Sequence, residues 1–312
     1  MCYNYLYNSS NILERSTWIM NNDRLFKKIL VPISSEFYSK KVIKRGLELA
    51  EIFQSNLTIA YIMEEKTLHK TEKLLETYLP FLDKTETQKE VIKKERETAD
   101  LIVFEEANKL LKNYTIYFDK KVLYGEFSDV ILSEVKHHSY DLVIIGYQKA
   151  CLLNYRLIDT LKIPVWIETE DTEEAPRDIL LGVCSNLAPN KKVPNISLIL
   201  SKLLGWKLHI LYIVDTEDTV EVDEKGSRYS KDRDTLLLSG RNFVNKMREK
   251  GITAELIQGR FENEVIKKAN EINPRLIVIG REKKQRGKLG LPIRNVKRKI
   301  VEKSKHSVLL LN

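Results

Sequence analysis

The chain has 312 residues, of which 43% are hydrophobic and 31% are charged, a balance typical of globular proteins. It contains no apolar stretch near the roughly 20 residues that a membrane-spanning helix needs, and its start lacks the basic and apolar regions of a secretory signal. The net charge of +8 comes from residues 281–306, which alone sum to +9; this excludes a protein that is basic over its whole surface.

Periodic sequence begins at Met20, and the residues before it show no regular strand or helix pattern. We therefore interpret residues 1–24 as a flexible tail, although an initiation codon chosen too early would equally explain residues 1–19. Cys2, Cys151 and Cys184 are far apart and lack metal-ligand spacing. Such cysteine usage fits a reducing compartment, so we expect a cytoplasmic protein.

Short aliphatic runs then alternate with helical patterns. We predict strands near residues 28–33, 57–63, 116–123, 141–146 and 164–168, since nearly continuous β-branched runs suit a parallel sheet buried on both faces. Between the first two runs, apolar residues recur at helical spacing. Residues 64–97 are rich in Lys, Glu and Thr, and we interpret them as a mobile helical excursion that leads into a helix near 99–111.

The second half of the chain repeats the first in the same order, at offsets of 134 to 151 residues. The matching blocks are KKILVPISS (27–35) with RDILLGVCS (177–185), NLTIAYIM (56–63) with KLHILYIV (207–214), LYGEFSDVI (123–131) with IQGRFENEVI (257–266), and YDLVIIG (140–146) with PRLIVIG (274–280). A period of this length is that of a domain. We predict two tandem doubly wound α/β domains, 25–168 and 178–312, joined by an acidic linker at 169–177, each with a five-stranded parallel sheet flanked by helices.

These blocks, with the closing VKRKIVEKSKHSVLLL (296–311), resemble the universal stress protein family over about 290 residues. The resemblance implies an adenine nucleotide alpha hydrolase-like fold, a role in stress response, and pairing of domains through their last strands. Both last strands lie in this one chain. We therefore expect Val165–Ile167 beside Val308–Leu310, which would make the chain a pseudo-dimer.

ATP-binding members of that family carry Gly-x2-Gly-x9-Gly-Ser/Thr after the fourth strand and an Asp at the end of the first. Glycines let backbone N–H groups approach phosphates, and the next helix points its N-terminus at them. In the first half, Ser34 replaces the Asp, and the stretch from Gly146 to Pro164 is nine residues shorter than that from Gly280 to Ser307. We therefore expect little room for a triphosphate there.

In the second half the pattern survives only in part. Gly280 matches the first glycine, Lys283 replaces the second, Arg294-Asn295 replace the final pair, and Cys184 replaces the Asp. The resemblance thus implies a candidate nucleotide site, with ATP as the cofactor if any binds, made of Cys184, Ile213, Gly280, Lys283, Gly287, Gly290, Arg294 and Asn295.

Two features of this half leave alternatives open. The basic loop 281–295 could bind phosphate through side-chain cations, or it could be a solvated surface that faces an acidic patch. Cys184 could be a thiol activated by that loop, or a small hydrophobic residue at a strand end. The loop has no interleaved aromatic residues, so nucleic acid is not an expected partner. We expect structural roles for His137, His138, His209 and His306, and no metal site.

The sequence contains no nucleophile elbow, Walker loop, zinc-protease motif or paired carboxylates, and we predict no catalytic residue. The leading hypothesis is a non-catalytic stress-response protein that works through unidentified protein partners, with an eroded nucleotide site. The alternatives are an ATP-binding regulatory module that uses the basic loop and, third, a slow nucleotide hydrolase. Any ATP binding is expected only in the second half, weak and salt-dependent.

Overall fold

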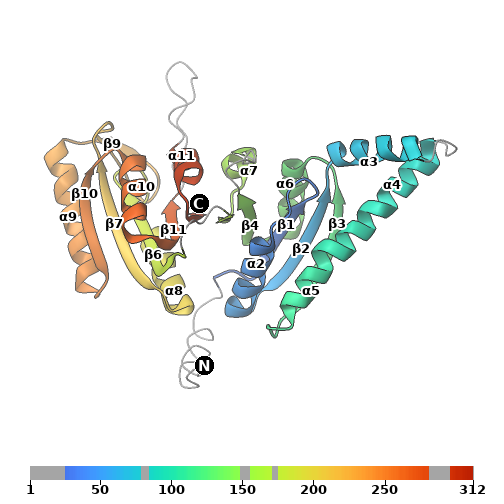
Figure 1. The fold of residues 1–312 in the computed structure, drawn as a ribbon. Helices are drawn as coiled ribbons and strands as arrows, with labels where there is room; N and C mark the ends of the chain where they lie inside the picture. The colour runs from blue at the N-terminus through green and yellow to red at the C-terminus, as the bar shows by residue number, and fades with distance from the viewer. Residues whose placement is uncertain (1–24, 79–83, 148–154, 171–174, 281–295, 312) are drawn as a thin grey trace, which may run out of the picture.

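In the computed structural model, which describes residues 25–78, 84–147, 155–170, 175–280 and 296–311, a single ten-stranded sheet runs through both halves of the chain (Figure 1). The strand order is β10-β7-β6-β11-β12-β5-β4-β1-β2-β3. Each half contributes five mutually parallel strands, which confirms the predicted fold class. The strands of the first half are β1 (Lys28–Ser34), β2 (Asn56–Met63), β3 (Phe118–Tyr124), β4 (Leu142–Tyr147) and β5 (Val165–Thr169). Those of the second are β6 (Arg177–Ser185), β7 (Lys207–Asp215), β10 (Thr253–Gly259), β11 (Pro274–Gly280) and β12 (Ser307–Leu311).

Helices cover both faces of the sheet (Figure 1). They are α2 (Lys40–Phe53), α3 (Glu65–Tyr78), α4 (Lys84–Thr98), α5 (Glu105–Leu111), α6 (Phe127–His138), α7 (Tyr155–Thr160), α8 (Lys192–Leu204), α9 (Arg233–Glu249), α10 (Phe261–Ile272) and α11 (Val296–Lys303). Local sequence sets several of their ends. The Ser39 hydroxyl accepts a hydrogen bond from the Val42 amide at the start of α2, and Gly205 ends α8 in the left-handed conformation at φ 72°.

Alternation of side chains along the strands explains the aliphatic runs. In β2, Leu57, Ile59 and Met63 pack into the core on one face, while Ala60 and Ile62 pack into the core on the other. All five are at most 1% exposed. A strand covered on both faces needs apolar residues at every position, which is why the pattern lacks polar alternation.

The predicted excursion at 64–97 is helical, as α3 and α4, and α4 continues through a π-helical turn, η1 (Ala99–Phe104), into α5. Figure 1 shows α3 and α4 extending beyond β3 as an arm. Strand β3 begins at Phe118 rather than at the predicted residue 116, and Tyr117 is 89% exposed. The short hairpin β8 (Val220–Val222) and β9 (Arg228–Ser230), a separate two-stranded sheet, was not predicted.

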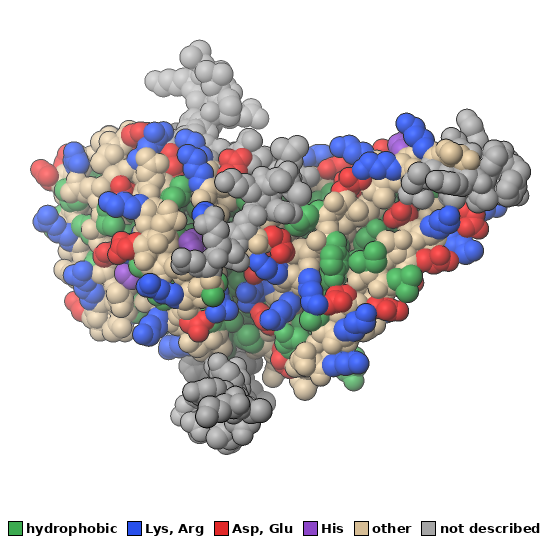
Figure 2. Space-filling view, viewed as in Figure 1, with side chains coloured by type: hydrophobic (Ala, Val, Ile, Leu, Met, Phe, Trp, Pro, Cys, Tyr) green, Lys and Arg blue, Asp and Glu red, His purple; other side chains and the backbone are tan. Residues whose placement is uncertain are grey.

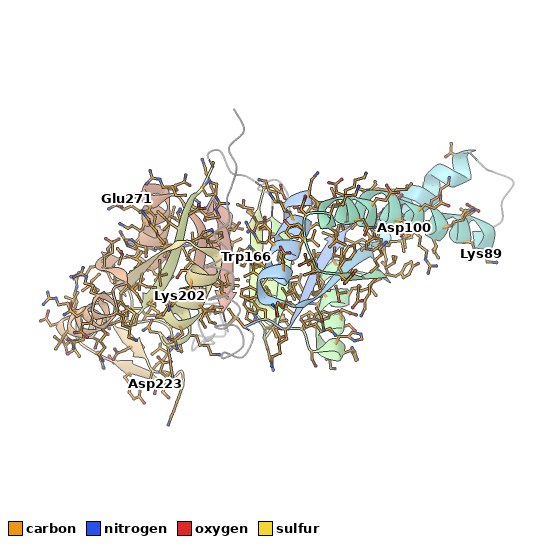
Figure 3. The ribbon with its side chains drawn as sticks, turned by 90° about the horizontal axis from the view of Figure 1, so that it is seen from below. Lys89, Asp100, Trp166, Lys202, Asp223 and Glu271 are labelled. Atoms are coloured by element: carbon orange, nitrogen blue, oxygen red, sulfur yellow. The ribbon has the colours of Figure 1, made fainter. Side chains whose placement is uncertain are left out.

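The two halves meet along an antiparallel pair of strands, which we call the seam. Ile167 faces Val308, Trp166 faces Leu309, and Val165 faces Leu310, so the strands expected to be neighbours lie side by side. This pairing covers two strands that would otherwise be exposed edges. Figure 3 shows Trp166 between the halves. In the part of the chain that the structure describes, no helix is long and apolar enough to cross a membrane.

Candidate functional site

The carboxyl ends of β1 and β4 frame a cavity of about 540 Å³, which we call the first-half cavity. Doubly wound sheets bind ligands at this position, where the strand order reverses, and the volume is in the usual range for small-molecule sites. The lining residues are Pro32, Ile33, Ser34, Glu36, Phe37, Ser39, Val42, Glu64, Lys66, Glu126, Phe127, Ile145, Gly146 and Tyr147. The expectation of little room for a triphosphate rested on the segment between Gly146 and Pro164; residues 148–154 of it lie outside the described residues, so it stays a prediction. Cavity size here depends on how the loops after β1, β2 and β3 stand around the sheet end, and not only on the short segment after β4.

Hydroxyl groups in the first-half cavity already have partners from the protein. Ser34 Oγ donates to the Glu64 carboxylate and accepts from the Glu36 amide at 2.9 Å. Ser39 Oγ donates to the carboxylate of Glu170 and accepts from the Val42 amide at 3.1 Å. Both serines therefore fix the turn between β1 and α2.

The charge of the first-half cavity is negative. Its lining contains three carboxylates, Glu36, Glu64 and Glu126, and one ammonium group, Lys66. Hydrogen bonds from Thr67 and Lys70 lower the pKa of the Glu36 carboxyl, so Glu36 is ionised at neutral pH. This arrangement opposes a triphosphate, because like charges at short range raise the free energy of binding.

None of these carboxylates belongs to a motif that the sequence predicts as a site. Glu64 directly follows β2, and Glu126 accepts from the Asp129 amide at 2.9 Å as the N-cap of α6, directly after Gly125. Gly125 has φ 127°, a backbone conformation that only glycine adopts without strain. The signal that could have found both residues is their position one to three residues after a predicted strand, at the same sheet end as Ser34.

The corresponding end of the second half is filled by its own loop. Asn190 accepts from the Ser185 amide at 3.0 Å and donates to the Ser185 carbonyl at 2.9 Å. Asn186 is fully buried, donates to the Val220 carbonyl at 2.8 Å and accepts from the Asp215 amide at 2.8 Å. As a result, the pocket that Cys184 and Gly280 share measures only about 10 Å³ among the described residues.

The structure brings together two of the predicted site residues. Cys184 and Gly280 line the same small pocket, whereas Ile213 is fully buried in β7, packs in the core and does not line that pocket. The other five, Lys283, Gly287, Gly290, Arg294 and Asn295, lie outside the described residues.

The hypothesis of an activated thiol at Cys184 is wrong. The side chain is 2% exposed, and burial, with a smaller contribution from Glu224, raises the pKa of the thiol well above its usual range. A thiol nucleophile needs a depressed pKa and access to solvent. Cys184 therefore acts as a small hydrophobic residue.

We expect Cys184 to resist alkylation in the native protein. The reaction at mildly alkaline pH should be at least about a hundredfold slower than in denaturant, because both the thiolate fraction and access are low. Peptide mass spectrometry after iodoacetamide treatment would measure Cys184 separately from Cys2 and Cys151. Equal labelling of Cys184 in native and denatured samples would contradict the assignment.

The histidines with described surroundings have structural contacts. His209 Nε2 lies 2.7 Å from Glu255 Oε1 across neighbouring strands, and His137 Nδ1 lies 2.7 Å from the Ser133 carbonyl oxygen. Burial lowers the pKa of His306, which precedes β12. Within the described ranges, no group of three or more His, Cys, Asp or Glu side chains is placed to hold a metal ion.

Comparisons with known proteins agree with this architecture. Residues 25–159 match the sequence profile of the universal stress protein family. A search of curated proteins finds no significant match. A structure from Pseudomonas aeruginosa UCBPP-PA14, assigned to the universal stress proteins, is 15% identical with a TM-score of 0.64, covering 93% of this chain and 95% of that one. A universal stress protein from Archaeoglobus fulgidus DSM 4304 is 14% identical with a TM-score of 0.61, covering 93% and 97%. These structures share the fold across both halves.

Proposed function

We propose, from the premise that residues 25–159 belong to the universal stress protein family, that this chain is a tandem, non-catalytic universal stress protein whose nucleotide affinity is weak or lost in both halves. We assign the two domains to 25–168 and 178–312 and place the protein in the cytoplasm. It would act through contacts with other proteins, and the seam would supply within one chain the pairing that separate subunits otherwise make.

The observation that carries this proposal is the amount of space and the charge at the carboxyl ends of the two sets of strands. Among the described residues, the first half has space but three carboxylates against one ammonium group, and the pocket at the second sheet end measures about 10 Å³. A phosphate chain needs inward N–H groups or cations in a concave loop. The described residues offer that combination at neither sheet end.

The lack of catalysis is supported by the bonding of the cavity hydroxyls. Ser34 and Ser39 each donate to a carboxylate and accept from a backbone amide, which uses them as turn and cap residues. A serine nucleophile also needs donors that stabilise the developing oxyanion, and the three carboxylates that line this cavity oppose a second negative charge. We therefore propose no hydrolytic role for this cavity.

Calorimetric titration with ATP tests the proposal. We expect no binding, or weak binding that fades as salt shrinks the Debye length to about 10 Å at 0.1 M. The Glu64→Gln variant removes one carboxylate from the first-half cavity and should leave the affinity low, since Glu36 and Glu126 remain. Tight, salt-insensitive binding by the unaltered protein would overturn the proposal.

A second candidate function is an ATP-binding regulatory module in the second half. It is favoured by the local charge of +9 in residues 281–306. Side-chain cations on long stems lose more entropy on binding than fixed amides do, so the affinity would be low. The Lys283→Ala/Arg294→Ala variant separates the candidates: loss of measurable low-salt binding in this variant, but not in Glu64→Gln, would favour the second.

A further inference from the structure

The ten-stranded sheet has two outer strands, β3 in the first half and β10 in the second. Among the described residues, β3 pairs only with β2, and β10 pairs only with β7. Figure 1 shows the two outer strands at opposite ends of the molecule, with the arm of α3 and α4 beside β3. An outer strand presents backbone N–H and C=O groups to which another strand can bond, so each edge can form an interface.

The edge at β3 carries more exposed apolar surface than the edge at β10. The large exposed apolar side chains of the arm and of β3 with the residue before it are Ile92, Leu101, Ile102, Tyr117 and Tyr124. Among the described residues, none of the large exposed apolar side chains lies on β10. Figure 2 shows apolar side chains among the charged ones where α4 and β3 lie. Apolar surface gathered at one end of a molecule is typical of a protein contact.

The side chains of β3 alternate between the two faces of the sheet. On one face, Phe118 and Val122 are partly buried against the core to which η1 contributes. Lys120 lies between them on this face, with its Nζ 5.4 Å from the centre of the Phe104 ring in η1. Since this chain covers Phe118 and Val122 only in part, apolar residues of a neighbouring strand would extend the same core.

The other face of β3 combines two charges with an apolar residue. Asp119 is exposed, Lys121 forms an ion pair with Glu134 of α6, and Leu123 is partly buried. Tyr117, directly before β3, is 89% exposed. A partner strand that suits this face therefore has a basic residue opposite Asp119 and an acidic residue opposite Lys121.

A second copy of β3 meets these requirements when it runs antiparallel and the twofold axis passes through Lys120. The facing residues of the two copies are then Asp119 with Lys121, Phe118 with Val122, and Tyr117 with Leu123. Each of these pairs occurs twice, because a twofold interface uses the same surface of both copies. An axis through Asp119 or Lys121 would instead place charged residues opposite aromatic or aliphatic ones.

We propose that this chain forms a dimer in which β3 pairs with β3 of a second copy in this register and joins two ten-stranded sheets. Arg96 Nε of α4 donates to the Tyr124 hydroxyl at 3.1 Å, so the arm runs alongside β3. The pairing therefore brings Leu101 and Ile102 of both copies to the same face of the joined sheet. This inference goes beyond the proposed function and is independent of it, since it involves neither nucleotide nor the seam.

Sedimentation velocity of the full-length protein over a range of concentrations tests the dimer. Lys120 faces its own copy across the axis, and Lys120→Thr removes this repulsion, so we expect the Kd to fall by about tenfold. Asp119→Lys places a lysine opposite Lys121 twice and should raise the Kd by about tenfold. Thr253→Lys, which adds a lysine to the exposed start of β10, is the matched control and should leave the Kd unchanged.

A single cysteine tests the register. In a Cys2→Ser/Cys151→Ser background, Lys120→Cys places two thiols directly opposite each other, with Cα atoms about 4.5–5.5 Å apart, which a disulfide can span. Mild oxidation should link these chains but not those of Asp119→Cys, whose two copies lie on either side of the axis.

Three results would overturn the proposal. The first is a protein that remains monomeric at the highest concentration measured, which would mean that the lysines of β3 protect the edge from pairing. The second is a dimer whose Kd responds to neither Lys120→Thr nor Asp119→Lys. The third is a disulfide that forms equally well at both cysteine positions, which would exclude this register.

Discussion

Replacing Trp166 with alanine is expected to lower the free energy of unfolding by about 3–5 kcal/mol. Trp166 is fully buried at the seam, where Arg45 lies over its ring at 5.3 Å and its Nε1 donates to Glu168 Oε2 at 2.7 Å. Truncation leaves a cavity between the halves and removes one donor from a buried carboxylate, and both effects are destabilising. Urea denaturation followed by circular dichroism would measure the change.

Trp206→Ala is the matched control for this prediction. Trp206 is only partly buried, directly precedes β7, and has the Arg275 guanidinium over its ring at 5.5 Å. Its truncation should cost less, about 1–2 kcal/mol, because less surface leaves the core. A loss for Trp166→Ala no greater than that for Trp206→Ala would show that the seam contributes little to stability.

The strands of this fold could be predicted from the sequence because a strand that is buried on both faces consists of a nearly continuous run of aliphatic residues. That rule predicted β1, β2, β4 and β5 to within two residues at each end. It placed the start of β3 too early, because Ile116 and Tyr117 are apolar or aromatic but precede an edge strand. It missed the β8–β9 hairpin, whose three-residue strands VEV and RYS have no apolar run to detect.

The sheet ends were less predictable, since their shape depends on side chains that bond across loops. Comparing loop lengths suggested more space in the second half. Among the described residues, the first half has the larger cavity, because Asn186 and Asn190 hold the loop after β6 against the sheet end of the second half. No periodicity or spacing encodes such bonds. The glycine pattern also does not include Glu64 and Glu126, whose carboxylates line the first-half cavity.

The second large loss of stability is expected when the ion pair between Arg45 and Glu168, beside Trp166, is broken. Arg45 Nε lies 3.0 Å from Glu168 Oε2, and the two side chains are 12% and 9% exposed. Arg45 Nη1 also contacts Glu48 at 2.6 Å. Removing one partner of a buried pair leaves an uncompensated charge, so Arg45→Met should destabilise the protein by about 3–5 kcal/mol. Lys44→Met, next to it but more exposed, is the control and should cost less than about 0.5 kcal/mol.

The double variant Arg45→Met/Glu168→Gln distinguishes a charge effect from a packing effect. If the cost of Arg45→Met arises from the unpaired carboxylate, neutralising Glu168 should recover much of the loss, because Gln still accepts a hydrogen bond from Trp166 while its desolvation costs less. The double-mutant cycle should therefore give a coupling energy of about 1–3 kcal/mol. Strictly additive losses in urea denaturation would mean that Arg45 stabilises the seam through its packing on Trp166 alone, and that the ion pair orients the guanidinium without adding to the stability of the two joined halves.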